Sequence, residues 1–96
     1  MDSKHGEPYY SRAVAAQEKG NTQEAITNFS EAIRQRPDDA QAHYLRGLLY
    51  TETGKTKEAI ADYTQAIRIE PELAGAYRNR GIAYARSGQM DKAIAD

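Results

Sequence analysis

A 34-residue internal repeat is the feature that most constrains the fold of this chain. Residues 6–39 match residues 40–73 at 12 of 34 positions, and residues 40–73 match residues 74–96 at 10 of 23. Proline follows the same spacing, because Pro37 recurs as Pro71. A period of roughly 20 to 50 residues is typical of stacked-repeat architectures. We therefore expect a repeat protein in which each copy packs on the next.

Within each copy the apolar residues follow the period of an α-helix. Residues 56–69 have one apolar stripe, formed by Ala59, Ile60, Tyr63, Ala66 and Ile67. The polar residues lie off this stripe and are expected at the surface: Lys57, Glu58, Asp62, Gln65 and Arg68. Residues 40–53 have two stripes, one with His43, Gly47 and Tyr50 and a second with Tyr44, Leu45, Leu48 and Thr51. The first helix of each copy therefore has two faces to cover, and the second helix has one.

Turn residues stand where these helices should end. Gly54 is placed to end the first helix as a left-handed cap residue, and Pro71 prevents the second helix from continuing. Asp39 is a predicted N-cap for the helix that follows. Small residues recur where the paired helices should cross: Ala13, Gly47 and Gly81 on the first helices, and Ala25, Ala59 and Ala93 on the second. The sequence predicts a unit of helix, tight turn, helix and short link.

Composition narrows the possible functions. The 96 residues are 28% charged with a net charge of −1, so no overall charge directs the chain to nucleic acid or to an anionic membrane. Without cysteine the chain has no thiolate metal site. Neither histidine has convergent partners in the sequence, and His43 stands where the other copies place Tyr9 and Tyr77, so we expect it to pack rather than to catalyse. We predict no enzyme activity, cofactor or metal, and we favour a cytoplasmic location because no signal or spanning segment is evident.

A 34-residue helix-turn-helix with glycine, alanine, tyrosine and proline at these positions resembles the tetratricopeptide repeat family: Gly47, Tyr50, Gly54, Ala59, Tyr63, Ala66 and Pro71 carry the likeness. The resemblance implies an all-α, right-handed α-solenoid of stacked antiparallel helix pairs. It departs from the family at Arg12, Arg46 and Arg80, where leucine is usual, and we expect packed stems with guanidinium groups at the surface.

We expect the repeats to form a single domain. We expect a disordered leader over residues 1–6, then repeat 1 over 7–39, repeat 2 over 40–73, and repeat 3 over 74–96, truncated in its second helix. That truncation predicts either a part of a longer protein or a short chain that completes itself by pairing with another copy. It also predicts self-association or fraying of residues 89–96.

The resemblance implies a concave groove lined by the first helix of each pair. The corresponding positions are Tyr10, Val14, Gln17, Glu18, Tyr44, Leu45, Leu48, Thr51, Glu52, Arg78, Asn79, Ile82, Ala85 and Arg86. Val14, Leu48 and Ile82 form an aliphatic strip in register. Two interpretations stay open: the side chains pack between repeats, or they bind a ligand.

Charge is unevenly distributed along this wall. Net charge is −2 over residues 1–39, −1 over 40–73 and +2 over 74–96. A protein or peptide partner with an apolar centre and an acidic end would fit this gradient, and a merely solvated face would also produce it.

Family members that bind the C-termini of heat-shock chaperones hold the terminal carboxylate with a clamp of lysine, asparagine and arginine. The corresponding positions here do not match it: Tyr10, Val14, Leu45, Gly75 and Asn79. We therefore expect a protein-interaction module of a different binding type. The alternatives are a scaffold segment that self-assembles through exposed repeat ends and a helical-repeat RNA binder, against which the 34-residue period and the acidic first half count.

Overall fold

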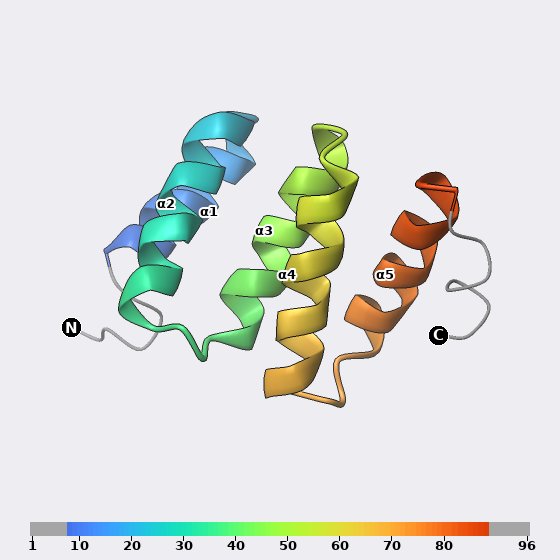
Figure 1. Ribbon diagram of the computed structural model, residues 1–96. Coiled ribbons are helices and arrows are strands. Elements are labelled where there is room, and N and C mark those ends of the chain that lie inside the picture. The colour runs from blue at the N-terminus through green and yellow to red at the C-terminus, as the bar shows by residue number, and fades with distance from the viewer. Residues whose placement is uncertain (1–7, 89–96) are drawn as a thin grey trace.

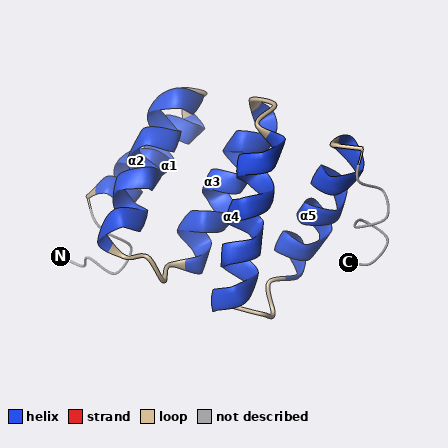
Figure 2. Ribbon diagram, in the orientation of Figure 1, coloured by secondary structure: helices blue, strands red, loops and turns tan. Residues whose placement is uncertain are grey.

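The computed structural model describes residues 8–88. They form five α-helices, which run as α1 Tyr9–Glu18, α2 Thr22–Gln35, α3 Ala40–Glu52, α4 Thr56–Ile69 and α5 Ala74–Arg86. The helices stand in a row of antiparallel pairs, with α1 and α2 at one end and α5 at the other (Figure 1). No strand occurs in the described part of the chain (Figure 2). The all-α solenoid of stacked helix pairs expected from the sequence is confirmed.

Glycine ends each first helix as predicted. Gly54 has a φ of +78°, a left-handed conformation that costs glycine no Cβ strain. The Gly54 N–H donates to the Thr51 carbonyl at 3.2 Å, and the Lys55 N–H donates to the Tyr50 carbonyl at 2.9 Å. These two bonds form a Schellman motif that satisfies the last carbonyls of α3. Gly20 repeats the conformation after α1, with a φ of +82°.

The links between repeats are also as the sequence predicts. Asp39 caps α3, because its side chain accepts a hydrogen bond from the Ala42 N–H at 3.2 Å. Pro37 and Pro71 both fall in the short links that follow α2 and α4. The links reverse the chain so that α3 packs on α2 and α5 packs on α4.

The core is built from small residues at the helix crossings and large ones beside them. Ala13 and Ala25 are fully buried where α1 meets α2. At the crossing of α3 with α4, a methyl group added to Gly47 would lie 2.7 Å from the ring of Tyr63. The largest fully buried side chains are Tyr63, Phe29 and Leu49. Burial of each contributes about 2 to 3 kcal/mol, so these side chains hold the pairs together.

Helix α3 uses both of its faces. Ala42 and Leu49 pack into the cluster built by α1 and α2, whereas Gly47 meets Tyr63 of α4. Leu49 is 1% exposed, although the sequence stripes did not include it. The first helix of the middle repeat is thus the element that joins neighbouring helix pairs. The prediction of fraying or self-association over residues 89–96 falls outside the described residues.

Candidate functional site

The predicted groove residues all lie on the three first helices. Eight of the fourteen are half-buried: Tyr10, Val14, Gln17, Tyr44, Leu45, Leu48, Thr51 and Asn79. The other six are exposed: Glu18, Glu52, Arg78, Ile82, Ala85 and Arg86. Direct contact between α3 and α5 places those two helices side by side. The wall is therefore continuous over repeats 2 and 3.

Tyr44 connects α3 to α5. Its hydroxyl accepts a hydrogen bond from Asn79 Nδ2 at 3.1 Å. The same hydroxyl fills the space over Gly75, where an added Cβ would lie only 2.7 Å from it. The Tyr44 ring also lies 6.1 Å from the ring of Tyr63, centroid to centroid, so the buried α4 tyrosine supports it from below. Tyr44 is held at a defined position on the wall.

The repeat 1 end of the wall is more strongly tied to the core. The Tyr10 ring meets the ring of buried Phe29 edge-on, at 5.6 Å between centroids. Burial raises the pKa of Tyr10, and the nearby charge of Asp39 raises it further. Val14 and Leu45 pack against the same cluster. These side chains stabilise the fold whether or not they also contact a ligand.

The repeat 3 end is more open. Ile82 is 43% exposed, and Tyr77 is the other large hydrophobic residue of the described chain that is similarly exposed. Leu48 packs on Tyr63 and Ala83 and is half-buried. Ile82 therefore leaves apolar surface exposed on α5, next to α3.

Three of the four charged residues of the predicted wall lie at the ends of the first helices, and the fourth, Arg78, lies within α5. Glu18, Glu52 and Arg86 are the last residues of α1, α3 and α5. A glutamate at a helix C-terminus opposes the helix dipole, whereas an arginine there complements it. Stability therefore does not account for the two glutamates.

A short chain of hydrogen bonds joins α3 to Tyr63 of α4. Tyr63 Oη and Thr51 Oγ1 are 2.9 Å apart, and Thr51 donates to the Gly47 carbonyl at 3.0 Å. Burial raises the pKa of Tyr63, whereas the hydrogen bond to Thr51 and the charge of Arg86 lower it in part.

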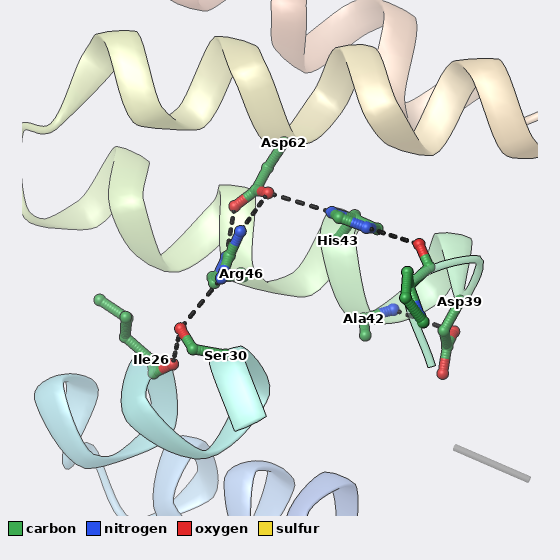
Figure 3. Close-up of polar contacts among 8 residues, drawn as sticks. Ile26, Ser30, Asp39, Ala42, His43, Arg46 and Asp62 are labelled. Atoms are coloured by element: carbon green, nitrogen blue, oxygen red, sulfur yellow. Dashed lines mark hydrogen bonds and ion pairs between the residues drawn. The ribbon is translucent and has the colours of Figure 1, made fainter. Parts of the chain in front are cut away.

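The structure also contains a buried polar network that the sequence analysis missed (Figure 3). Asp62 is 3% exposed, so the expectation that it lies on the solvent face of α4 was wrong. Its carboxylate accepts two bonds from Arg46, Nε to Oδ2 at 2.7 Å and Nη2 to Oδ1 at 2.8 Å. The guanidinium of Arg46 is therefore only partly exposed, because a buried carboxylate on α4 holds it against the neighbouring repeat.

The network continues to both neighbours of α3. Arg46 Nη1 donates to Ser30 Oγ of α2 at 2.9 Å. On the other side, His43 Nδ1 lies 3.2 Å from Asp62 Oδ1, and its Nε2 lies 3.1 Å from the Pro37 carbonyl oxygen. His43 is 7% exposed, so the predicted packing role is accompanied by two polar contacts.

A related bond recurs one repeat later, where Arg80 Nη1 donates to Thr64 Oγ1 at 3.1 Å. The sequence did contain a signal for these arginine–hydroxyl bonds, because both partners recur at the repeat spacing. Arg46 and Arg80 are 34 residues apart, and so are the hydroxyl residues Ser30 and Thr64. Arg12, the third member of the series, is exposed and lies over the ring of Tyr9 at 5.4 Å.

Two further features give no indication of chemistry. Across residues 8–88 no three histidine, cysteine or acidic side chains converge as metal ligands. A hollow of about 460 Å³ lies away from the predicted groove residues, and it is lined by Arg36, Asp38, Asp39, Ala40, Gln41, Ile69 and Glu70. Its lining is of mixed charge and comes mainly from the links between repeats.

Within residues 8–88, no helix is both long and apolar enough to cross a bilayer.

The geometry defines a class: a helical-repeat solenoid in which α3 and α5, the first helices of neighbouring repeats, lie side by side. Within that class the chain belongs to the tetratricopeptide repeat family, whose sequence profile matches residues 10–74 and 52–96. The tetratricopeptide repeat is in general an interaction module rather than an enzyme, so protein binding is the function that membership implies. A comparison with curated proteins found no match.

Solved structures agree with this assignment. Two crystal structures of MamA superpose with a TM-score of 0.90 at 33% identity over 98% of this chain. The chain spans about half of those proteins, 55% and 51% of their lengths. The second TPR of Spaghetti (RPAP3), bound to the HSP90 peptide SRMEEVD, superposes with a TM-score of 0.89 at 24% identity, covering 97% of this chain and 86% of that one. The last likeness concerns the fold alone.

Proposed function

We propose that the chain binds a peptide, or a helix of a partner protein, along the wall formed by α1, α3 and α5. The observation that carries this proposal is the exposure of Ile82, which leaves 43% of its surface open on α5, while its counterpart Leu48 on α3 is half-buried. Single exposed apolar residues are common, but Ile82 continues the aliphatic register of Val14 and Leu48 on successive first helices, and a row of such residues is a candidate docking surface. The second TPR of Spaghetti, which has the same fold, is bound to an HSP90 peptide.

The charge pattern supports a ligand with an acidic end. Arg78 and Arg86 flank Ile82 on α5 and are exposed, whereas Glu18 and Glu52 stand on the other two helices. Complementary charge orients a ligand and excludes the reverse orientation more than it adds affinity. We therefore place the acidic end of the ligand at repeat 3 and its apolar centre over Leu48 and Ile82.

The binding mode that we propose is not the carboxylate clamp. Clamp proteins need a lysine and an arginine at the positions of Gly75 and Asn79. Here the Tyr44 hydroxyl occupies the space over Gly75 and accepts a hydrogen bond from Asn79. A long basic side chain at position 75 would have to displace this tyrosine, so the two arrangements exclude each other.

A peptide selection tests the proposal. The protein is immobilised and used to select from a phage-displayed library of random 12-residue peptides. We expect the wild type to enrich peptides with an aliphatic centre and an acidic end, and Ile82→Glu to lose them. Ala61→Glu is the matched control, because Ala61 is exposed on α4, away from the wall. Helicity by circular dichroism should stay unchanged in both variants, and equal enrichment by Ile82→Glu would contradict the groove.

A second function is favoured by the other exposed hydrophobic residue. Tyr77 on α5 is 37% exposed, whereas His43, its counterpart one repeat earlier, is 7% exposed. Self-association through this face would make the chain a scaffold segment. Sedimentation equilibrium from about 5 to 200 μM, with wild type and Tyr77→Ser, tests it. A mass that does not change with concentration would remove this alternative.

A further inference from the structure

The His43 ring lies between two oxygen atoms that both act as hydrogen-bond acceptors (Figure 3). Its Nδ1 is 3.2 Å from Asp62 Oδ1 of α4, and its Nε2 is 3.1 Å from the main-chain carbonyl oxygen of Pro37, in the link before α3. A main-chain carbonyl can only accept. Both oxygens of Asp62 accept hydrogen bonds from Arg46, so they too act as acceptors. Each ring nitrogen of His43 therefore needs a proton to make its contact.

Only a ring that carries a proton on each nitrogen satisfies both contacts. A neutral histidine has one N–H and one lone pair, so one nitrogen would point its lone pair at an oxygen lone pair. The His43 side chain is 9% exposed, which leaves little access for a water molecule to bridge the two atoms. The charged ring donates to both oxygens, whereas each neutral form loses one bond.

The groups in direct contact oppose and favour this extra proton. Burial disfavours a charged ring, and so does the like charge of Arg46, which shares the carboxylate of Asp62. Asp62 favours the charged ring, because it is an opposite charge at hydrogen-bonding distance. The Pro37 carbonyl adds a second hydrogen bond to the charged form.

The wider surroundings add negative charge. The hollow at the N-terminal end of α3 is lined by one guanidinium group and three carboxylates: Arg36, Asp38, Asp39 and Glu70. On α2, Glu31 and Arg34 pair with each other at 3.3 Å and contribute no net charge. With Asp62 and Arg46 included, four carboxylates stand against two guanidinium groups, and this balance favours a cation.

The arrangement belongs to repeat 2 alone. The equivalent positions in the other copies are Tyr9 and Tyr77, and tyrosine does not titrate near neutral pH. A change of pH near neutrality would therefore act where the link after repeat 1 meets α4, and not at the junction of repeats 2 and 3.

We propose that His43 is protonated on both nitrogens in the folded chain, and that this proton joins the link after repeat 1 to α4 of repeat 2. The junction of these repeats is then a pH-sensitive element of the fold. A group that binds its proton more tightly in the folded chain stabilises it while protonated, and this contribution is lost as the pH rises. An ordinary buried histidine has the opposite sign, because it is neutral when folded and destabilises the fold when acid protonates it.

Nuclear magnetic resonance of the imidazole nitrogens tests the protonation directly. The experiment uses His5→Gln labelled with ¹⁵N-histidine, which leaves His43 as the one histidine of the sequence. We expect both nitrogens to be protonated at pH 7, where an unperturbed histidine is mostly neutral. A neutral tautomer at pH 7 would overturn the proposal, and this measurement does not require a variant at position 43.

A second measurement tests what the proton does. Between about pH 6.5 and 8.5, the urea midpoints of wild type and His5→Gln should fall relative to that of His43→Gln. The N-terminal amino group titrates in the same range, but it is common to all three proteins. Parallel profiles for wild type and His43→Gln would contradict the proposal.

Amide hydrogen exchange locates the effect in the chain. Over the same pH interval, protection factors in α2 of the wild type should fall by about three- to tenfold, the equivalent of one hydrogen bond. Protection in α5, which packs on α4 beyond this junction, should change less. An equal loss in α2 and α5 would show that the proton does not act at the junction of repeats 1 and 2.

Discussion

Arg46 of α3 donates two hydrogen bonds to the carboxylate of Asp62 on α4, of 2.7 Å and 2.8 Å. The Asp62 side chain is 4% exposed and that of Arg46 is 20% exposed. Burial opposes the charge on Arg46, and the hydrogen bond and charge of Asp62 outweigh it, so the pKa of the guanidinium is raised. Two helices of one repeat are thus joined by a largely buried ion pair. Removal of one partner should be costly because the other would be left buried without its counter-ion.

Asp62→Asn tests that cost. The amide cannot accept both donors of Arg46, and the arginine keeps a charge without its counter-ion. We expect a loss of about 2 to 3 kcal/mol, or roughly 10 to 20 °C in Tm for a domain of this size. Glu58→Gln, exposed on the same helix, should change stability by less than about 0.5 kcal/mol. Thermal unfolding followed by circular dichroism measures both, and a Tm of Asp62→Asn within 2 °C of wild type, taken as about the error of the method, would contradict the account.

Two glycines at equivalent positions should respond oppositely to alanine. In α3 an added Cβ at Gly47 would lie 2.7 and 2.9 Å from ring carbons of Tyr63, which is fully buried and cannot move away. In α5 an added Cβ at Gly81 would have no described atom within 4 Å, apart from its chain neighbours and the backbone of its own helix. Alanine gains about 1 kcal/mol of helix propensity at either site. The clash at Gly47→Ala costs about 1 to 3 kcal/mol, so we expect net destabilisation there and stabilisation by Gly81→Ala, as urea unfolding would show.

Alkaline pH should weaken the fold through Tyr63. Its pKa is raised in the folded state by burial, above the ordinary value of 10.0 that applies when the chain unfolds. Its contribution is therefore fully present below about pH 10 and is lost as the pH rises further, because the unfolded chain releases its proton first. We expect the urea midpoint of wild type to fall more steeply between about pH 9 and 11 than that of Tyr63→Phe. Parallel slopes would show that another group dominates.

The bonds from arginine to a hydroxyl group between repeats should each contribute measurably. Ser30→Ala removes the acceptor of Arg46 Nη1, and Thr64→Ala removes that of Arg80 Nη1. Each loss should cost about 1 kcal/mol, since the arginines are partly exposed. Thr27→Ala provides the control, because Thr27 is exposed on α2. In a cycle with Arg46→Met, the effect of Ser30→Ala should largely disappear, and full additivity would contradict the bond.

Local signals allowed much of the fold to be predicted from sequence. The positions of Gly54, Pro71 and Asp39 depend on backbone chemistry within a few residues, and the structure confirms the predicted ends of α3 and α4. Tertiary partners were harder to predict. A helical stripe assigns Asp62 to water because it is charged, and only the approach of Arg46 from another helix makes its burial favourable.

In the candidate groove, too, the local placement of residues could be predicted but their tertiary contacts could not. Sequence register placed Tyr44 and Asn79 on neighbouring first helices, but their contact depends on the missing side chain at Gly75. Glycine in a helix usually signals close packing or a turn, and which side chain will use the space follows only from three-dimensional placement. Leu49 was missed for a related reason, because α3 packs on the preceding pair through a face that one repeat alone does not define.

The bonds from Arg46 to Ser30 and from Arg80 to Thr64 cross from one repeat to the one before it. In such a row of repeats, the free energy of unfolding is approximately the sum of the stability of each repeat and the interaction energy at each interface between neighbouring repeats. Damage at a single boundary therefore does not stay local, because both flanking repeats lose the same stabilising term. Hydrogen exchange along α2, α3 and α4 should rise together when one such boundary is removed, and the helix pairs would unfold as a unit rather than repeat by repeat.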